Sequence, residues 1–324
     1  MTFSTTVAGD AITVLVNDAA ADSYVALILQ RFPEVRVLSA KDAVLLDRHI
    51  AEADILLGPR FPVDLLAKAR RLRWFQCSNA GIDSVLPIRD RIGDIIVTNA
   101  RGMHSEIIAD FVIAAVTIMH WDFPRFIREQ SRKKWHPREV APLAERTLGI
   151  VGLGSIGAAI ARRGKTIGMT VIGSKRDLTH PIAVVDRLFP PDGLAELLQL
   201  SDFVVLAVPH LPETDKLIGR EQLRLMRRTA FLINIGRGSL IVERELIEEL
   251  RAGTISGALL DVFEREPLPT DSPLWTMPNV IVTPHVAGNP SGYSTRVFEI
   301  FGDNLQRFLE KKPLRNVVDL MRGY

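Results

Sequence analysis

Apolar residues in the first hundred positions form short β-like runs that alternate with helix-like stretches. The runs rich in Val, Ile and Leu, which predict strands, are residues 11–16, 35–38, 55–58, 72–77 and 95–98. The stretches between them that predict helices are residues 21–31 and 63–70. Apolar strands separated by helices indicate a parallel sheet that is covered by helices on both faces.

A second α/β series begins at Leu148, after a long apolar stretch over residues 105–120 that predicts a helix. Between them lies a charged, proline-punctuated segment, residues 125–146, which we interpret as a surface arm or subunit contact. The predicted strands of the second series are residues 148–151, 170–173, 203–207, 230–235, 257–260 and 280–283. Helices are expected between most of them, including one over residues 246–251 that ends near Gly253, a common helix terminator.

The chain closes with a predicted helix over residues 294–309 that no strand follows. We therefore expect this helix to return to the first domain. The resulting organisation is a discontinuous first domain, residues 1–101 and 289–324, interrupted by a continuous second domain over residues 102–288. A length of 324 residues suits two domains of ordinary size.

Composition agrees with an aliphatic α/β core, since 47% of residues are apolar, 24% charged and only 6% aromatic. A net charge of +2 with dispersed basic residues does not support nucleic-acid binding. Residues 1–10 lack a signal-peptide pattern, and no apolar run approaches the roughly 20 residues of a membrane span, so we expect a cytoplasmic protein without membrane contact. The single cysteine, Cys77, excludes an intrachain disulfide and a Cys-based metal site; we expect an inert core thiol and no metal.

The first strand of the second series runs into a glycine-rich turn. Residues 148–157 read as an apolar strand, then Gly152-x-Gly154-x-x-Gly157, then a helix. In this pattern Gly152 permits the tight turn, Gly154 lets a pyrophosphate approach the backbone, and Gly157 lets the helix pack closely on the strand. The strand before and the helix after the glycines supply the context that the motif requires, so the sequence predicts a dinucleotide site.

The next strand ends in a hydroxyl and two cations rather than in a carboxylate. Ser174, Lys175 and Arg176 stand where a cofactor with a free ribose 2′-hydroxyl would need Asp or Glu. Two cations match a 2′-phosphate, which favours NADP(H), with NAD(H) as the alternative. Asp177 is the competing ribose ligand, and a solvated Lys-Arg pair on a surface turn is the bland interpretation.

Three further chemical groups follow strands of the same domain. Arg237 lies between glycines after the strand at 230–235, Glu266 follows the strand at 257–260, and His285 ends the last strand. Each residue alone is more often a surface or structural residue. Because carboxyl ends of parallel strands meet at one edge of a sheet, their coincidence indicates a shared site.

The chain strongly resembles the D-isomer-specific 2-hydroxyacid dehydrogenases, of the NADP-type glyoxylate/hydroxypyruvate reductase kind. The matching text lies at residues 78–83, 153–157, 234–238, 260–269, 271–275 and 278–285, so the resemblance spans nearly the whole chain. It implies two doubly wound parallel-sheet domains, with a Rossmann cofactor domain inserted into a flavodoxin-like substrate domain. It also implies a homodimer, with Trp135 on the arm that contacts the partner subunit.

The resemblance implies hydride transfer between NADP(H) and a small 2-hydroxy or 2-oxo acid with D-stereospecificity. Arg237 would bind and polarise the substrate, His285 would act as general acid/base, and Glu266 would orient His285. These roles suit the chemistry, because a fixed cation stabilises charge that develops on the keto oxygen and histidine titrates near neutrality. The substrate is also expected at the backbone N–H groups of Asn79, Ala80 and Gly81. The remaining implied cofactor positions are Ser155, Ile156, Val208, Pro209, Thr214, Ile235, Gly236, Asp261 and Gly288.

The chain departs from the family pattern at a few positions. Asp110 replaces a glutamate, which we expect to matter for structure only, and His210 replaces a leucine, where it either aids 2′-phosphate binding or sits in a surface loop. His104 and Ser105 either touch substrate or, for Ser105, cap a helix. Two other functions remain as alternatives: a nucleotide-sensing, corepressor-like binding protein, and a phosphite or formate dehydrogenase on the same scaffold.

Overall fold

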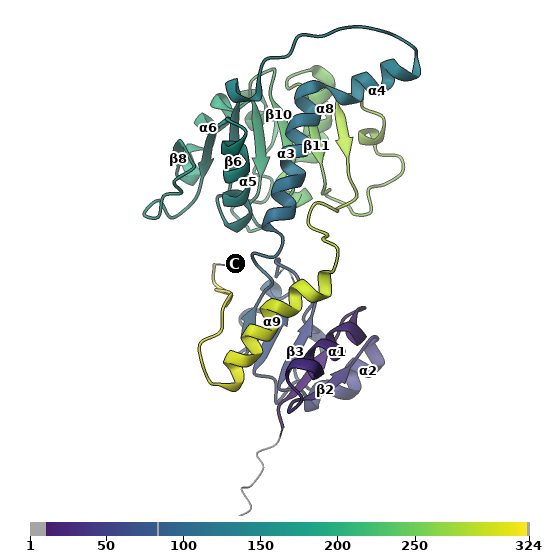
Figure 1. Cartoon of the computed structure of the whole chain (residues 1–324), viewed down its shortest axis with the longest axis vertical. Helices are drawn as coiled ribbons and strands as arrows, with labels where there is room; N and C mark the ends of the chain where they lie inside the picture. Colours follow the sequence, from purple (N-terminus) through teal and green to yellow (C-terminus); the bar gives the residue numbers. More distant parts are fainter. Residues whose placement is uncertain (1–10, 83, 323–324) are drawn as a thin grey trace, which may run out of the picture. The chain divides into compact units, whose positions relative to one another are not determined.

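The structure is a computed structural model that describes residues 11–82 and 84–322. The expectations for residues 1–10 and for Asp83 lie outside this described part. The chain divides into two compact units, with boundaries between Met103 and His104 and between Asn289 and Pro290. Figure 1 shows the helices and strands of both units.

Five strands among the described residues of the first unit form a parallel sheet in the order β2-β1-β3-β4-β5. The strands are β1 Thr13–Val16, β2 Arg36–Ser39, β3 Ile55–Gly58, β4 Trp74–Cys77 and β5 Ile96–Thr98. The helices are α1 Ala21–Arg31, α2 Ala43–His49 and α9 Tyr293–Leu309. This strand order is the flavodoxin-like one, as expected.

The C-terminal helix α9 packs in the first unit, where its aromatic side chains cover the sheet. The Trp74 ring of β4 stacks on Phe301 and Phe308 of α9, with ring centroids 5.2 and 5.5 Å apart. Phe301 is completely buried. Trp74 and Phe301, which are 227 positions apart along the chain, thus share one core, because α9 and the sheet would each alone leave an apolar face exposed to water.

The second unit, residues 104–289, carries a seven-stranded parallel sheet in the order β12-β11-β10-β9-β6-β7-β8. Its strands are β6 Thr147–Val151, β7 Thr170–Ser174, β8 Arg187–Phe189, β9 Phe203–Leu206, β10 Phe231–Asn234, β11 Gly257–Leu260 and β12 Val280–Val282. Its helices are α3 Ser105–Trp121, α4 Phe123–Ser131, α5 Ser155–Thr166, α6 Leu194–Leu200, α7 Arg220–Leu225 and α8 Glu243–Ala252. The order places β6 between β7 and β9, which is the Rossmann arrangement, so the predicted fold class is confirmed.

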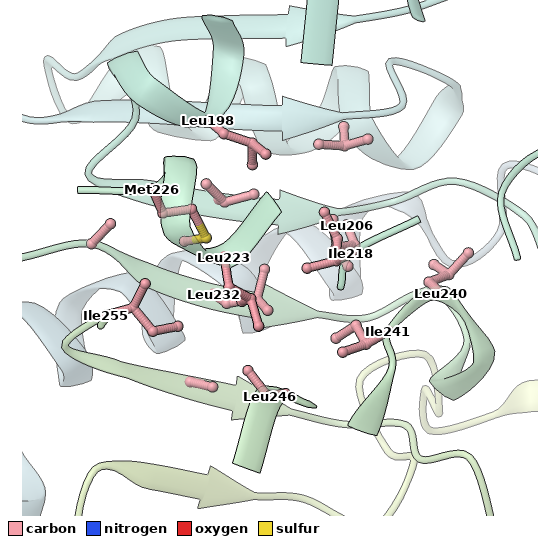
Figure 2. Close-up of a cluster of buried hydrophobic side chains, with 14 of the residues drawn as sticks. Leu198, Leu206, Ile218, Leu223, Met226, Leu232, Leu240, Ile241, Leu246 and Ile255 are labelled. Atoms are coloured by element: carbon pink, nitrogen blue, oxygen red, sulfur yellow. The ribbon is translucent and has the colours of Figure 1, made fainter. Parts of the chain in front are cut away.

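Apolar cores lie on both faces of the seven-stranded sheet. Figure 2 shows one of them, where Leu206 and Leu232 of the sheet face Leu223 and Leu246 of the covering helices. The other core contains side chains from α3 and α5, and buried α3 residues include Val112. Burial on both faces explains why these strands read as continuous apolar runs in the sequence.

Most predicted elements are present with shifted ends, and four differ. Helix α2, Ala43–His49, was not predicted. Residues 63–70 contain only a 3₁₀ turn, Val63–Leu65. None of its three side chains is fully buried, and helices in proteins gain most of their stability by packing an apolar face. The first part of the expected arm is helical: α4 begins after Asp122, whose carboxylate accepts from the Arg125 N–H at 3.3 Å. Strand β8 was not predicted, because a three-residue edge strand carries too little periodicity.

Two smaller expectations concern the core and the membrane. Cys77 is fully buried, as expected for a core thiol. Within the described residues no single helix is long and apolar enough to span a membrane; α3 and α4 satisfy those criteria only as a pair bent by 57°.

Candidate active site

The loops that leave the carboxyl ends of the seven strands carry most of the predicted site residues. The glycine-rich turn follows β6, and the loop after β9 begins at Ala207. Strand order reverses between these two neighbours, which is where ligands bind in open parallel sheets. Arg237 follows β10, Asp261 follows β11 and His285 follows β12, so all of these groups share one edge of the sheet.

Three glycines shape the turn between β6 and α5. Gly152 has a φ of 101°, and a Cβ there would lie 2.6 Å from Cγ1 of Val208. A Cβ on Gly157 would lie 2.1 Å from the Gly152 carbonyl oxygen, so close packing of the helix requires glycine there. Around Gly154, by contrast, no atom lies within 4 Å of the position that a Cβ would take.

No packing against the protein requires a glycine at position 154, because a Cβ there would lie in open space. Gly154 is also the N-cap of α5, and no side chain caps this helix end. A helix N-terminus with free N–H groups and a backbone that anions can approach fits a pyrophosphate. The residues present therefore fit a dinucleotide cofactor.

The turn after β7 holds the glycine loop and carries the first predicted cation. The carbonyl oxygen of buried Ser174 accepts from the backbone N–H of Gly152 at 3.2 Å and of Leu153 at 2.9 Å. The Lys175 Nζ donates to the His180 carbonyl oxygen at 2.9 Å. Ser174 thus links β7 to the glycine loop through its backbone.

Arg176 and Asp177 lie on the exposed part of this turn with opposite surroundings. The Arg176 guanidinium forms an ion pair with Glu213, a residue of the loop after β9. The Asp177 carboxylate accepts from the Thr179 backbone N–H at 2.9 Å and contacts Nδ1 of His180 at 2.8 Å. These hydrogen bonds, those from Thr179 foremost, hold the pKa of Asp177 well below its usual range. The carboxylate is engaged by its own turn.

Thr214 organises the loop after β9. Its hydroxyl donates to the Pro209 carbonyl oxygen at 2.7 Å, and it accepts from the Leu211 backbone N–H at 2.8 Å. Nε2 of His210 lies 3.1 Å from Oδ1 of Asp215. The expected role of His210 in phosphate binding stays a prediction, and in this structure its ring contacts a carboxylate.

The turn that presents Arg237 is built by a buried amide. Asn234, the last residue of β10, is fully buried; its Oδ1 accepts from the Gly236 N–H at 3.1 Å and its Nδ2 donates to the Arg237 carbonyl at 2.9 Å. Nη1 of Arg237 donates to the Gly236 carbonyl oxygen at 2.8 Å. A Cβ on Gly238 would lie 1.8 Å from the carbonyl carbon of Phe263, so the turn packs against that backbone.

Glu266 and His285 meet directly. Nδ1 of His285 lies 2.8 Å from Oε2 of Glu266, and Oε1 of Glu266 accepts from the backbone N–H of Phe263 at 3.0 Å. The imidazole and carboxylate are 51% and 37% exposed, so the pair is open to solvent and to a ligand. His285 also has a φ of 53°, which is uncommon for a residue other than glycine and marks a special position.

Asp261 holds the loop on which His285 lies. The residue is 1% exposed, and its carboxylate accepts from the Thr283 hydroxyl at 2.6 Å and from the N–H groups of Val286 at 2.9 Å and Ala287 at 3.0 Å. Its carbonyl oxygen accepts from the His285 N–H at 2.9 Å. The sequence suggested a contact to the cofactor for Asp261; the structure gives it a role in orienting the histidine loop.

The remaining predicted cofactor residues lie along the same edge of the sheet. Ser155 and Ile156 open α5, Ile235 and Gly236 follow β10, and Gly288 lies near the side chains of Ile108 and His104 in the second unit. Sequence reasoning assigned no role to Asn234, Thr283 or Glu213. Asn234 and Thr283 lie within segments that resemble the family, and that resemblance could have drawn attention to them. Glu213 became apparent only from its contact with Arg176.

Near the start of α3, two polar side chains are buried. The helix begins at Ser105 with His104 as N-cap and no side-chain capping bond, so Ser105 is not a cap, and its hydroxyl has no hydrogen-bond partner among the described residues. Burial lowers the pKa of His104, which favours the neutral imidazole. Further along α3, Asp110 pairs with Nε of Arg163 at 3.0 Å, which agrees with a structural role.

In the first unit, the loop after β4 carries the residues that the sequence predicts to meet the substrate. Asn79 is exposed, and Ala80 and Gly81 are partly buried. The Ala80 carbonyl accepts from Nδ2 of Asn99 at 2.7 Å, which anchors the loop to the segment after β5.

One hollow lies away from these residues. A cavity of about 420 Å³ lies at the opposite edge of the seven-stranded sheet, beside the end of α8; its lining residues are Leu250, Arg251, Pro273, Thr276, Met277, Pro278 and Asn279. Among the residues that the structure describes, no group of three or more His, Cys, Asp or Glu side chains is arranged to hold a metal ion.

Residues 113–287 match the family model described as "D-isomer specific 2-hydroxyacid dehydrogenase, NAD binding domain". The chain belongs to this family. A glyoxylate reductase of Korarchaeum cryptofilum is 37% identical over 274 residues, covering 82% of this chain and 81% of the relative. A D-3-phosphoglycerate dehydrogenase of Methanocaldococcus jannaschii is 32% identical over 298 residues, which cover 90% of this chain but only 57% of that longer protein.

Solved structures of the family agree with the fold. A D-isomer specific 2-hydroxyacid dehydrogenase from Xanthobacter autotrophicus Py2, in complex with NADPH and MES, is 32% identical with a TM-score of 0.88, covering 97% of this chain and 100% of that chain. An NADPH-dependent glyoxylate/hydroxypyruvate reductase from Sinorhizobium meliloti, in complex with NADP and sulfate, is 29% identical with a TM-score of 0.87 over the same shares. This chain is therefore an oxidoreductase of the D-2-hydroxyacid dehydrogenase family, as the sequence predicted.

Proposed function

We propose that this enzyme transfers a hydride between NADP(H) and a small 2-oxo or 2-hydroxy acid, with D-stereospecificity. Glyoxylate and hydroxypyruvate are the first substrates to test, because relatives at this level of identity carry those names. The observation that carries the proposal is the 2.8 Å contact between His285 and Glu266 at the sheet edge that also presents Arg237.

The proposed chemistry divides between a cation and an acid. When bound, the nicotinamide supplies or accepts the hydride at the substrate's second carbon. Arg237 binds the substrate and stabilises the negative charge that reduction builds on the keto oxygen, because a fixed guanidinium needs no reorganisation as that charge develops. His285 delivers the proton to this oxygen in reduction and removes it in oxidation.

Glu266 serves by fixing the imidazole. Its Oε1 is tied to the Phe263 N–H, so Oε2 is presented to Nδ1 of His285. A carboxylate only accepts hydrogen bonds, which places a proton on Nδ1 and leaves Nε2 to exchange the catalytic proton. Asp261 supports this arrangement because its carboxylate accepts hydrogen bonds from Thr283 and Val286, on either side of His285.

The cofactor preference rests on the turn after β7. Lys175 and Arg176 supply two cations, while the Asp177 carboxylate is engaged by Thr179 and His180 and is thereby removed as a ribose ligand. A 2′-phosphate would take the place of Glu213 beside Arg176. The complexes of related proteins with NADPH and NADP support the same preference, and NAD(H) remains the weaker alternative.

We also propose a cytoplasmic homodimer that joins through the segment around α4. Trp135 is 92% exposed and Ile127 is 64% exposed, and large exposed apolar side chains favour a protein contact. Size-exclusion chromatography with light scattering tests this. A dimer that dissociates when both residues are changed to serine supports the assignment, and a wild-type monomer contradicts it.

The deciding experiment follows NADPH and NADH oxidation separately with a panel of 2-oxo acids. We expect turnover of glyoxylate or hydroxypyruvate with NADPH preferred. Arg176→Ala should raise KM for NADPH about tenfold and leave KM for NADH unchanged, the scale of one exposed charge-assisted contact. Equal or better turnover with NADH overturns the cofactor assignment.

Absence of turnover with every acid and both cofactors overturns the proposed reaction. Binding of NADPH without turnover would then favour the nucleotide-sensing alternative. Oxidation of phosphite or formate would favour the third.

A further inference from the structure

The loop after β4 has every carbonyl from residue 78 to residue 81 held by a donor within the first unit. The Asn79 carbonyl oxygen accepts from the Ala100 N–H at 3.0 Å, and that of Ala80 from Nδ2 of Asn99 at 2.7 Å. Both donors follow β5, the neighbouring strand. They account for the middle of the loop.

The two ends of the loop are held by side chains from different parts of the sequence. The Ser78 carbonyl accepts from the hydroxyl of Tyr293 at 2.9 Å, and the Gly81 carbonyl accepts from the thiol of Cys77 at 3.3 Å. Tyr293 is the first residue of α9 and lies 215 positions from Ser78.

Peptide planarity turns this pattern of carbonyls into a pattern of donors. In a trans peptide the carbonyl of one residue and the N–H of the next point in opposite directions. Because the carbonyls of residues 78–81 point to donors inside the unit, the N–H groups of residues 79–82 point the opposite way. None of these four N–H groups donates a hydrogen bond to any described residue. Backbone N–H groups that have no acceptor within the protein are available to hold an anion.

Tyr293 is suited to act as a permanent donor to this loop. Burial foremost, with the charges of Cys77 and Asp18, raises the pKa of Tyr293 to about 12, so its hydroxyl stays protonated at neutral pH. The same hydroxyl lies 3.0 Å from Oδ1 of Asn79, a second acceptor in the loop. The Tyr293 hydroxyl therefore contacts both the Ser78–Asn79 peptide and the Asn79 side chain.

We propose that Tyr293 is a positioning residue that aligns the N–H groups of the 79–82 loop with the carboxylate of the 2-oxo acid. This inference rests on the proposed function and on the expectation, implied by the family resemblance, that the substrate meets the backbone N–H groups of this loop. Tyr293 itself does not touch the reacting atoms. It sets the orientation of the Ser78–Asn79 peptide and thereby the direction of the first donor.

The test is Tyr293→Phe, which removes only the hydroxyl. We expect KM for glyoxylate to rise about three- to tenfold, the effect of losing one hydrogen bond that orients a donor, while kcat and KM for NADPH stay unchanged. The inhibition constant of oxamate, a carboxylate without a reducible keto carbon, should rise by the same factor. The matched control is Tyr24→Phe, a tyrosine of the same unit that is 1% exposed and makes no hydrogen bond to the described loop residues; its KM should equal that of the wild type.

The outcomes separate this inference from the proposed function. An active wild type with an unchanged KM in Tyr293→Phe overturns the inference alone. Loss of kcat, of NADPH affinity and of thermal stability together would show a general structural role and also overturn it. A wild type that neither reduces any 2-oxo acid nor binds oxamate overturns both.

Discussion

Glu266→Gln tests whether the carboxylate next to His285 works through its charge and its two acceptors. In the structure Oε1 accepts from the Phe263 N–H at 3.0 Å, and Oε2 contacts Nδ1 of His285 at 2.8 Å. A glutamine of the same shape offers one acceptor and one donor group. If its oxygen keeps the Phe263 bond, its NH₂ faces Nδ1, and the imidazole must take the opposite tautomer or lose this bond.

The expected loss follows from the contact and its exposure. A hydrogen bond to a charged group contributes about 1.5–3 kcal/mol. Because the imidazole is 51% exposed and the carboxylate 37% exposed, water screens the pair, and the lower end of that range, about 1.5 kcal/mol, applies. At 1.36 kcal/mol per factor of ten, kcat should fall about tenfold.

The assay is steady-state NADPH oxidation with saturating glyoxylate, with KM for NADPH measured in parallel. We expect kcat to fall and KM for NADPH to stay constant, because the change lies at the reacting end of the site. Asp271→Asn is the control: it makes the same chemical change at an exposed position five residues along the chain. A kcat for Glu266→Gln within twofold of the wild type would refute the reasoning.

Three further predictions follow from the structure. His285→Ala should lower kcat by about two to four orders of magnitude, the usual scale of a general acid, and near-normal turnover in that variant would remove His285 from the role. Gly238→Ala should lower the Tm by roughly 3–10 °C, because its Cβ would lie 1.8 Å from a backbone carbon and overpacking costs about 1–3 kcal/mol. Gly154→Ala, which has open space around its Cβ, should leave the Tm unchanged and raise KM for NADPH. An equal decrease in Tm for both variants would contradict this reasoning. Burial lowers the pKa of His104 in the folded protein, so below about pH 6.5 the unfolded chain binds more protons than the folded one, and stability should decrease as the pH is lowered. Thermal melts from pH 7 to pH 5 should show a smaller decrease in Tm for His104→Gln than for the wild type. Equal decreases in Tm would exclude His104 as the cause.

Local patterns located most of the elements and the groups that carry chemistry. Continuous apolar runs marked the strands because both faces of each parallel sheet are buried, and Gly152, Gly154 and Gly157 marked the cofactor turn because only glycine meets its steric demands. The short edge strand β8 and the turn at residues 63–70 were missed or mistaken. In such short segments the tertiary neighbours outweigh the local preference.

The pairing of groups came from the tertiary structure. Arg237, Glu266 and His285 were each visible in the sequence, but the 2.8 Å contact between the last two depends on loops after different strands. The orienting role of Asp261 and the pairing of Arg176 with Glu213 likewise depend on side-chain directions that no spacing encodes.

The family and the parallel α/β architecture were readable from the sequence alone, and the same patterns predicted the reactive residues. These features are local, since they depend on side-chain polarity, strand and helix periodicity and the steric freedom of glycine. Which acceptor each donor finds depends on the tertiary structure. Tyr293 shows the difference: as a residue it is one tyrosine at a helix start, and it bonds to Ser78 only because α9 packs on the first sheet, 215 positions away along the chain. Long-range hydrogen bonds are set by the packing of whole elements, and packing depends on the complete core rather than on any one segment.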